Sequence, residues 1–308
     1  MASNLPPVRE SIREIDEACW VIGETILLSR LKSPSAVSWG DGRGAFFAIS
    51  SIDSPLPQLR PVSAQSGIKL VHDAGDKSAV WEIGEAFCKV RVKEYHNTTR
   101  EHTTLHFVHE KQPSSFEAPA VLYHKDYNGR YYLITSRVEG ETIAQAWSTM
   151  DETMRSQAVT QVTRICKELA SWTHDHICGV DGQGLPDEYL VHGKDLEFTH
   201  STLLATCEDL GMDCRSKAFN FYHCDMGPGN IILNRSSGRL GVIDWETAGY
   251  VPTEWIRTKF RISSGMDLPE QCSEQSYDWR KRIQLRLGEE GFHDVAERWM
   301  TWFCSDKQ

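Results

Sequence analysis

One segment of the sequence gathers a histidine, two aspartates and an asparagine at a fixed spacing. His223, Asp225 and Asn230 form the pattern H-x-D-x-x-x-x-N, and Asp244 follows 19 residues after Asp225. Asp244 ends the apolar run 240–243, which predicts a short strand. An Asp and an Asn on one loop, facing a second Asp across a tight hairpin, can place three hard oxygen ligands around one point, as Mg²⁺ requires.

These residue types match the needs of phosphoryl transfer. A carboxylate must lie beside the acceptor hydroxyl to orient it and take its proton, and oxygen ligands must hold Mg²⁺ against a triphosphate. Asp225 is therefore the candidate catalytic base, and Asn230 and Asp244 are the candidate metal ligands. We include His223 in the catalytic set because we expect it to brace the loop by hydrogen bonding. A chance match is the alternative, since Asp and Asn are common in loops.

The elements that must position these residues change type along the chain. Alternating patterns predict strands over 68–71, 79–83, 86–92, 121–123 and 131–135, with a helix from about residue 101 and an Asn-Gly hairpin turn at 127–130. An apolar stripe from 154 to 172 and a second segment over 201–210 predict helices, and the tail beyond 250 also has a helical pattern. The order predicts an α+β protein with two lobes.

The first 60 residues are less easily interpreted. Apolar residues between 10 and 31 fall at helix-like spacing, so we expect a helix there. The glycine-rich segment 40–44 has two interpretations, a phosphate loop or a hairpin turn, and the hairpin is favoured.

The motif segments resemble a known family. The run 223–233, followed by 241–249, is similar to the aminoglycoside phosphotransferase/choline kinase-like family and to its fungal branch of phosphotransferases. Residues 133–141 resemble the interlobe hinge of that family, and the resemblance extends from about residue 68 to about residue 260. It implies a bilobal protein-kinase-like fold, with a small antiparallel β-sheet N-lobe containing one helix and a larger, mainly helical C-lobe.

The resemblance also implies a division of the chain. We expect an N-terminal extension over 1–60 that packs on the small lobe, a nucleotide-binding N-lobe over 61–137, and a helical C-lobe over 138–308 with the catalytic loop and the acceptor site.

A nucleotide site follows from the resemblance. The family uses a strand lysine that contacts the phosphates and a helix glutamate that pairs with it. Lys89, 14 residues after Gly75, fits the lysine, and Glu101 fits its partner, with Glu94 as the alternative. An exposed strand lysine is the other interpretation of Lys89.

The remaining nucleotide contacts are expected from two turns. The turn that includes Gly75 and Ser78 would cover the phosphates, although it lacks the glycine and lysine pattern of a P-loop. The hinge from Ser136 to Val138 would offer backbone hydrogen bonds to adenine. The implied cofactors are ATP and Mg²⁺, with GTP as an open alternative.

The sequence departs from the family pattern at two positions. Cys224 stands in the middle of the catalytic triplet where glycine is usual, and we expect it to adopt ordinary φ and ψ angles. Ser136 stands where an acidic residue is common. Both departures favour a second hypothesis, a catalytically silent kinase-like nucleotide-binding or scaffold protein.

Other polar groups have weaker interpretations. His102, His106 and His109 have the spacing of one helix face, which allows a metal face but favours ordinary surface or core contacts. His174 and His176 are expected to interact with the dipole of a helix end. Four acidic residues are candidates either for a pocket that binds a cationic acceptor or for a solvated surface: Asp187, Glu188, Glu246 and Glu254.

Net charge and residue composition limit the classes of partner that the protein could bind. The net charge of −10 argues against sequence-independent nucleic-acid binding and is compatible with a cationic small molecule. The nine cysteines include no C-x-x-C pair, and no apolar run is long enough to span a membrane. The start lacks a signal-peptide pattern, so we expect a cytoplasmic protein.

The expected activity is ATP- and Mg²⁺-dependent transfer of a phosphoryl group to a hydroxyl of a small molecule. The sequence leaves open the identity of this molecule and the oligomeric state of the protein.

Overall fold

The computed structural model describes residues 6–52, 55, 57–93, 95, 97–191, 196–216, 218–272 and 275–305. By its internal contacts the chain divides into two compact units. Unit 1 comprises Met1–His96 and Pro119–Arg137, and unit 2 comprises Asn97–Ala118 and Val138–Gln308. Glu94, the alternative partner for Lys89, lies outside the described residues.

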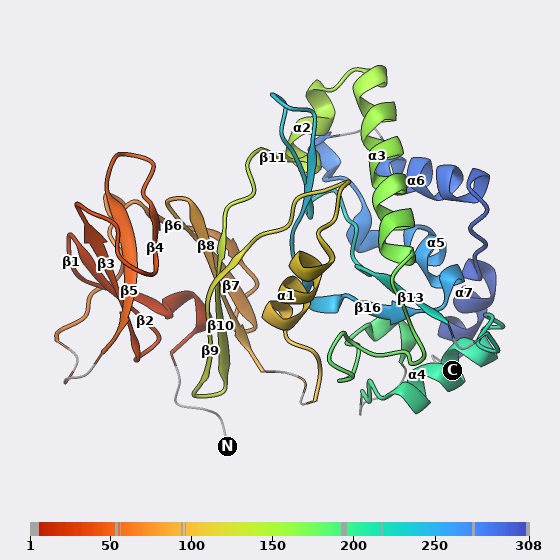
Figure 1. The fold of residues 1–308 in the computed structure, drawn as a ribbon, viewed down its shortest axis with the longest axis horizontal. Helices are drawn as coiled ribbons and strands as arrows, with labels where there is room; N and C mark the ends of the chain where they lie inside the picture. The colour runs from red at the N-terminus through yellow and green to blue at the C-terminus, as the bar shows by residue number, and fades with distance from the viewer. Residues whose placement is uncertain are drawn as a thin grey trace. The chain divides into compact units, whose positions relative to one another are not determined.

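The first part of unit 1 is a five-stranded antiparallel sheet (Figure 1). A short 3₁₀ helix, η1 (Val8–Glu10), precedes it. The strands lie in the order β1-β2-β3-β5-β4. Their bounds are β1 (Ile12–Asp16), β2 (Cys19–Ile22), β3 (Ile26–Leu31), β4 (Ser38–Gly40) and β5 (Phe46–Ser51).

The helix expected over residues 10–31 is therefore wrong. Buried residues alternate along β1 and β3, as Ile26 and Leu28 do in β3, and such a set fits a strand as well as a helix over so short a run. Gly23 decides between them, because its φ of +63° makes the turn between β2 and β3. A Cβ atom at Gly23 would lie 2.8 Å from the Tyr132 hydroxyl, so close packing also requires glycine there.

The glycine-rich segment 40–44 is a hairpin turn, as favoured from the sequence. It joins β4 to β5, which pair antiparallel. The Asp41 carboxylate accepts hydrogen bonds from the backbone N–H groups of Arg43 at 2.7 Å and Ala45 at 2.9 Å. The turn is thus closed by its own side chain.

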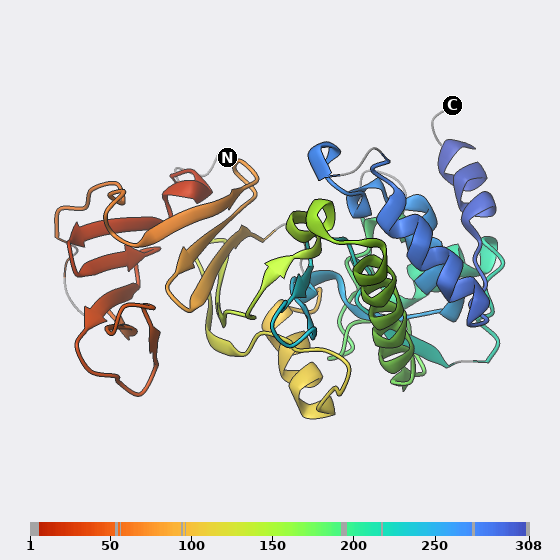
Figure 2. The same ribbon diagram turned by 90° about the horizontal axis from the view of Figure 1, so that it is seen from above.

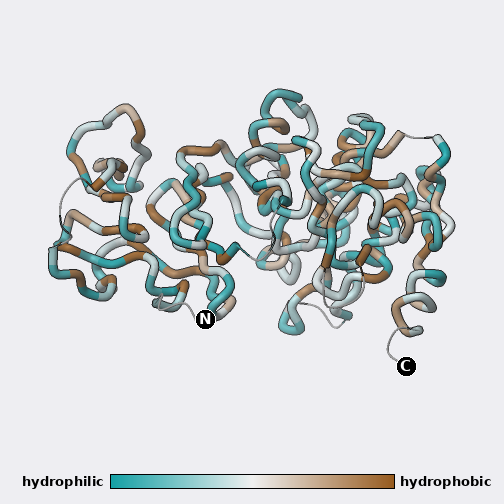
Figure 3. Tube along the Cα trace, turned by 90° about the horizontal axis from the view of Figure 1, so that it is seen from below, coloured by the Kyte–Doolittle hydropathy of each residue, from teal (hydrophilic) through white to brown (hydrophobic). Residues whose placement is uncertain are grey.

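The second sheet of unit 1 confirms the predicted strands. Its order is β6-β7-β8-β10-β9, and every neighbouring pair is antiparallel. Asn128 and Gly129 both have positive φ, which is the geometry that an Asn-Gly hairpin turn supplies. Hydrophilic and hydrophobic stretches alternate along the trace in Figure 3. The strands are β6 (Ile68–Asp73), β7 (Ser78–Ile83), β8 (Ala86–Val92), β9 (Val121–Tyr127) and β10 (Arg130–Ser136).

The two sheets of unit 1, seen from above in Figure 2, share one hydrophobic core. Trp39 of the first sheet donates a hydrogen bond from Nε1 to the carbonyl of Ile83 in the second, at 2.6 Å. Phe47 is 2% exposed and packs on Trp39 and Trp20. The N-terminal sheet therefore covers apolar surface that the second sheet would otherwise expose.

Unit 2 is mainly helical. Its longest helix, α3 (Glu152–Ala170), starts at Asp151, whose carboxylate accepts a hydrogen bond from the Met154 N–H at 2.8 Å. Helix α6 lies beside α3 in Figures 1 and 2. The helices predicted at 101, 154–172, 201–210 and in the tail are confirmed. The others are α1 (Glu101–Lys111), α2 (Ile143–Ala146), α4 (His200–Asp209), α5 (Thr253–Ile262), α6 (Asp278–Glu289) and α7 (Ala296–Ser305), with 3₁₀ helices η2 (Trp147–Thr149), η3 (Glu188–Leu190), η4 (Trp245–Thr247), η5 (Ser264–Met266) and η6 (Glu270–Cys272).

Two small antiparallel sheets position the motif residues in unit 2. One has the order β11-β14-β15 and the other β12-β13-β16. The segment 223–230 connects β13 to β14, and Asp244 follows β15. The strands are β11 (Glu141–Thr142), β12 (Thr173–His174), β13 (Phe219–Tyr222), β14 (Ile231–Leu233), β15 (Leu240–Val242) and β16 (Gly249–Val251).

The α+β prediction is confirmed, with a small unit of antiparallel sheets and a larger, mainly helical unit. By its contacts helix α1 belongs to the larger unit. None of the helices in the described ranges is both long enough and apolar enough to cross a membrane.

Candidate active site

His223 is buried between the two motif segments of unit 2. Its Nε2 donates to the carbonyl of Ile243 at 3.0 Å, and its Nδ1 accepts from the backbone N–H of Asp225 at 3.2 Å. Its ring also packs edge-on against Trp245, with ring centroids 4.7 Å apart. Both nitrogens are thus used in holding the loop 223–230 against the end of β15, and this pattern defines a neutral imidazole.

Cys224 corrects an expectation. Its φ is +65°, in the left-handed region, and not in the ordinary region expected from the sequence. A residue with a Cβ atom pays about 1 kcal/mol or more for this conformation, which is the reason glycine suits the position. The side chain is fully buried, and its thiol donates to the carbonyl of Tyr222 at 3.7 Å.

Asp225 and Asn230 are held together by two hydrogen bonds. The side-chain Nδ2 of Asn230 donates to the backbone carbonyl of Asp225 and to its carboxylate Oδ2, both at 3.0 Å. The backbone N–H of Ile243 donates to the carbonyl of Asn230 at 3.0 Å. Because the amide nitrogen of Asn230 is used in this way, the amide oxygen is the atom left to act as a ligand.

Asp244 lies next to two further carboxylates. One oxygen of each of Glu101, Asp244 and Glu246 can be chosen so that all three lie within 4.8 Å of one another. Asp244 itself has φ +65° and ψ +61°, a strained conformation of the kind that clusters at functional sites. Glu101, the first residue of α1, accepts a hydrogen bond from the Trp245 N–H at 3.2 Å, which fixes α1 to this segment.

The donor set fits Mg²⁺. Carboxylate and amide oxygens are its preferred protein ligands. Three carboxylates packed together repel one another unless a cation, either a metal ion or a lysine ammonium, lies among them. Asp244 and Asn230 were predicted as ligands from the sequence. Glu246, two residues after Asp244, was not, although the D-x-E spacing after an apolar strand was a usable signal.

The electrostatic environment of Asp225 suits a base. Burial raises the pKa of Asp225 to about 6, and the negative charge of Asp244 acts in the same direction. The charge of Lys259 and the hydrogen bond from Asn230 oppose this shift. A carboxylate with this pKa is ionised near neutral pH and is a stronger base than an ordinary aspartate.

A buried ion pair lies close to the loop. Lys259 of α5 and Asp187 before η3 are almost fully buried, and Nζ lies 3.0 Å from Oδ1. Trp255 donates from Nε1 to the other oxygen of Asp187 at 2.8 Å. Burial would lower the pKa of Lys259, but the charge of Asp187 outweighs this and the pKa is raised. Asp187 is therefore neither part of a solvated acidic surface nor an open pocket residue.

The predicted nucleotide residues of unit 1 lie on neighbouring strands. Gly75 has φ +68° in the turn between β6 and β7, where its N–H donates to the Asp73 carboxylate at 2.9 Å. Ser78 begins β7 and pairs with Arg91 of β8. Lys89 lies in β8 on the less buried face, opposite Val80 and Leu133, as the alternation predicted.

The two hinge residues belong to different units. Ser136 ends β10, and its hydroxyl accepts a hydrogen bond from the Ala120 N–H at 2.8 Å. Val138 belongs to unit 2, where it packs closely against Gly241 of β15. Unit 2 thus brings together Glu101, His223, Asp225, Asn230 and Asp244. That these residues form one nucleotide site together with the residues of unit 1 is still a prediction.

A comparison of the sequence with models of protein families shows which family the chain belongs to. The family model described as "Phosphotransferase enzyme family" matches residues 79–253, more than half of the chain. The chain belongs to this phosphotransferase family. The match includes Lys89 and Glu101 as well as the whole catalytic loop, and it confirms the family suggested by the motif. A comparison with curated protein sequences finds no match.

Solved structures of aminoglycoside phosphotransferases resemble the chain at low sequence identity. Aminoglycoside phosphotransferase APH(3'')-Id from Streptomyces rimosus is 16% identical, with 76% of this chain and 86% of that chain covered and a TM-score of 0.45. A thermostable mutant of APH(4)-Ia, in a ternary complex with AMP-PNP and hygromycin B, is 13% identical, with 76% and 82% covered and a TM-score of 0.48. At these scores the family assignment rests on the family model.

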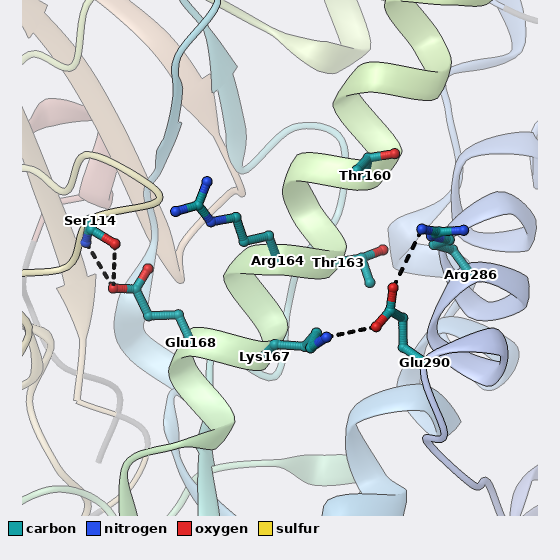
Figure 4. A pocket seen from close by; sticks show the side chains of 8 residues that line it. All are labelled: Ser114, Thr160, Thr163, Arg164, Lys167, Glu168, Arg286 and Glu290. Carbon is teal, nitrogen blue, oxygen red and sulfur yellow. Dashed lines mark hydrogen bonds and ion pairs between the residues drawn. The ribbon is translucent and has the colours of Figure 1, made fainter.

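A separate pocket lies in unit 2, between α3, α6 and the segment at Ser114 (Figure 4). It has a volume of about 370 Å³ and none of the predicted site residues lines it. Its charged groups are largely paired: Lys167 contacts Glu290 at 2.6 Å, and Glu168 accepts from the Ser114 N–H at 2.8 Å. We assign no function to this pocket.

Proposed function

We propose that the protein is an ATP- and Mg²⁺-dependent phosphotransferase that phosphorylates a hydroxyl of a small molecule. The observation that supports this most directly is the loop in which Asp225 and Asn230 are hydrogen-bonded to each other, with Asp244 close enough to raise the pKa of Asp225. This set occurs in a chain of the phosphotransferase family. It supplies a base and oxygen ligands at one place, as phosphoryl transfer requires.

In this mechanism Asp225 orients the acceptor hydroxyl and takes its proton. The hydroxyl oxygen forms a new bond to the γ-phosphorus while the bond from that phosphorus to the β–γ bridging oxygen breaks, so ADP leaves with the electron pair. Asn230 and Asp244, with Glu246 beside them, would hold Mg²⁺, which neutralises charge on the phosphates when bound. His223 holds the loop in place through its two hydrogen bonds.

We propose that Lys89 contacts the phosphates and that Glu101 orients it. The turn with Gly75 and Ser78 would cover the phosphates, and the backbone from Ser136 to Val138 would bind adenine. The acceptor remains a small molecule, and the net charge of −10 is compatible with a cationic one.

The first experiment measures nucleotide binding with and without Mg²⁺, followed by ADP release across a panel of amino alcohols, amines and sugars. We expect Mg²⁺-dependent ATP binding and acceptor-dependent ADP release. Asp225→Asn should keep nucleotide binding and lose turnover by at least about 100-fold, because general base catalysis contributes about 10²–10⁴-fold. Asp209→Asn, at an exposed aspartate at the end of α4, is the matched control. Unchanged turnover in Asp225→Asn would remove this residue from its role.

A silent kinase-like protein is the second candidate, favoured by the strained Cys224 in the catalytic triplet. It predicts nucleotide binding without phosphoryl transfer to any acceptor or to water. Absence of nucleotide binding, with or without Mg²⁺, would contradict both candidates.

A further inference from the structure

A second group of metal-ligand side chains lies in unit 2 outside the candidate active site. His174, the last residue of β12, is followed by Asp175 and His176, and Cys178 comes two residues later. His174, Asp175 and His176 offer one ligand atom each within 4.8 Å of one another. The three side chains are exposed, whereas Cys178 is buried beneath them at 3% exposure.

Two of the distances between these atoms are close to those in a tetrahedral metal site. In tetrahedral zinc sites with bonds of about 2.0–2.3 Å, neighbouring ligand atoms lie about 3.3–3.6 Å apart. His174 Nδ1 lies 3.4 Å from Asp175 Oδ1 and 3.7 Å from Cys178 Sγ. His176 Nδ1 lies 2.6 Å from Asp175 Oδ1, a hydrogen bond that a metal ion would replace.

The segment is held in place by its backbone and by ring contacts. The carbonyl of Cys178 accepts a hydrogen bond from the Tyr250 N–H at 2.8 Å, and the His174 ring stacks on the Tyr250 ring at 4.9 Å. His174 Nδ1 accepts a hydrogen bond from the His176 N–H at 3.1 Å, and a metal ion bound at this atom would have to displace that bond. A third imidazole, His200, lies 4.5 Å from the His176 ring and accepts from the Ile177 N–H.

We propose that His174, Asp175, His176 and Cys178 form a second metal site, one that binds a zinc-type transition metal. The donor set differs from that around Asp244, because imidazole and thiolate select zinc-like ions whereas carboxylate oxygens alone select Mg²⁺. Burial raises the pKa of Cys178 to about 11, so the metal must displace the thiol proton when it binds. The bound ion would join the end of β12 to the turn that follows it, residues 175–178.

The histidines of α1 do not form a comparable site in the part of the chain that the structure describes. The rings of His102 and His106 meet edge-on, with centroids 6.4 Å apart. Among the described residues, neither belongs to a cluster of three or more metal-ligand side chains. The experiment must separate metal binding at these two histidines from binding at the proposed site.

The test is a titration of the full-length protein with Zn²⁺ and with Co²⁺, monitored by calorimetry and by absorbance. We expect one tight Zn²⁺ ion per chain, a raised melting temperature, and a thiolate-to-cobalt charge-transfer band that disappears in Cys178→Ser. The double variant His174→Ala/His176→Ala should lose affinity by more than about 100-fold, since loss of an outer-shell partner alone costs 10- to 100-fold.

The matched control is His72→Ala/His293→Ala, which removes two exposed histidines far from this segment in sequence. It should bind Zn²⁺ like the unsubstituted protein. The single variant His176→Ala, at a residue with 53% side-chain exposure, repeats the test if the double variant fails to fold. Zn²⁺ binding that survives in His174→Ala/His176→Ala, or in His176→Ala at full affinity, would overturn the proposal. A cobalt band that persists in Cys178→Ser would overturn the part played by the thiol.

Discussion

Asp225 is a partly buried carboxylate whose folded-state pKa of about 6 exceeds the unfolded value of about 3.9. The folded protein therefore binds this proton more tightly than the unfolded chain. The stability that the protonated group contributes is fully present below about pH 4 and is lost as the pH rises through about 6. Above that pH the ionised Asp225 destabilises the fold, as is common where function and stability compete.

We therefore expect Asp225→Asn to be more stable than the unsubstituted protein near pH 8 in the presence of a chelator. The gain should approach about 2–3 kcal/mol at pH 8 and shrink to about 1 kcal/mol near pH 4.5. Urea unfolding at the two pH values measures it. Asp209→Asn should show no such pH-dependent gap, and a gap for Asp225→Asn that is constant with pH would contradict the assigned ionisation.

Cys224 allows a direct measurement of backbone strain. At ordinary positions alanine is more stable than glycine, because glycine loses more conformational entropy on folding. At Cys224, with φ +65°, the order should reverse: Cys224→Gly should exceed Cys224→Ala in the free energy of unfolding by about 1 kcal/mol. Both variants lose the same thiol contacts, so chemical denaturation of the pair isolates the strain. An alanine variant as stable as the glycine variant would exclude it.

Among the elements of unit 2, α5 is tied to η3 by the buried pair of Lys259 and Asp187. Removing one member leaves the other charge buried without its partner, which costs about 3–5 kcal/mol. Lys259→Met should show this loss, and the double variant Lys259→Met/Asp187→Asn should recover at least about 1 kcal/mol of it. Lys167→Met, at the half-exposed Lys167–Glu290 contact, should cost no more than about 1 kcal/mol. Equal losses at the two lysines, measured by urea unfolding, would contradict the importance of burial.

The elements predicted from the sequence are those with unambiguous local patterns. The Asn128-Gly129 turn and the apolar stripe of α3 each have a single interpretation, and both appear in the structure. The helix expected over 10–31 was wrong because the apolar residues there fit both the helix and the strand period. The turn at Gly23 and the pairing of β3 with β5 show that the segment forms strands. Such pairing joins residues distant in sequence, which a local pattern does not record.

The same distinction holds for the site. The motif predicted Asp225, Asn230 and Asp244 as site residues because their spacing is local to one loop and one hairpin. The approach of Glu101 to Asp244 and Glu246 joins residues more than 140 positions apart, and the left-handed conformation of Cys224 depends on the loop that His223 holds. The approach of Glu101 is a tertiary contact with no local signal, whereas the glycine that is usual at position 224 was a signal for the left-handed conformation.

At the scale of the whole molecule, the N-terminal sheet is part of the core of unit 1. Phe47→Ala should cost about 3–5 kcal/mol, because it opens a cavity where the two sheets share apolar contacts. Leu70→Ala, at a residue 40% exposed on β6, should cost far less. Chemical denaturation measures both. A small effect at Phe47 would show that the N-terminal sheet is dispensable for the stability of unit 1.

Unit 1 is interrupted in sequence by residues 97–118, which belong to unit 2. The polypeptide consequently crosses between the units at three places, after residues 96, 118 and 137. A single proteolytic cut at any one of them leaves the two units covalently joined, so limited proteolysis cannot release either as one uninterrupted fragment. During synthesis, moreover, α1 is made after β8 and before β10, so β8 cannot pair with β10 until α1 has been synthesised. Splitting this protein into separately expressed halves would therefore require relinking the chain, for instance by joining β8 directly to β9.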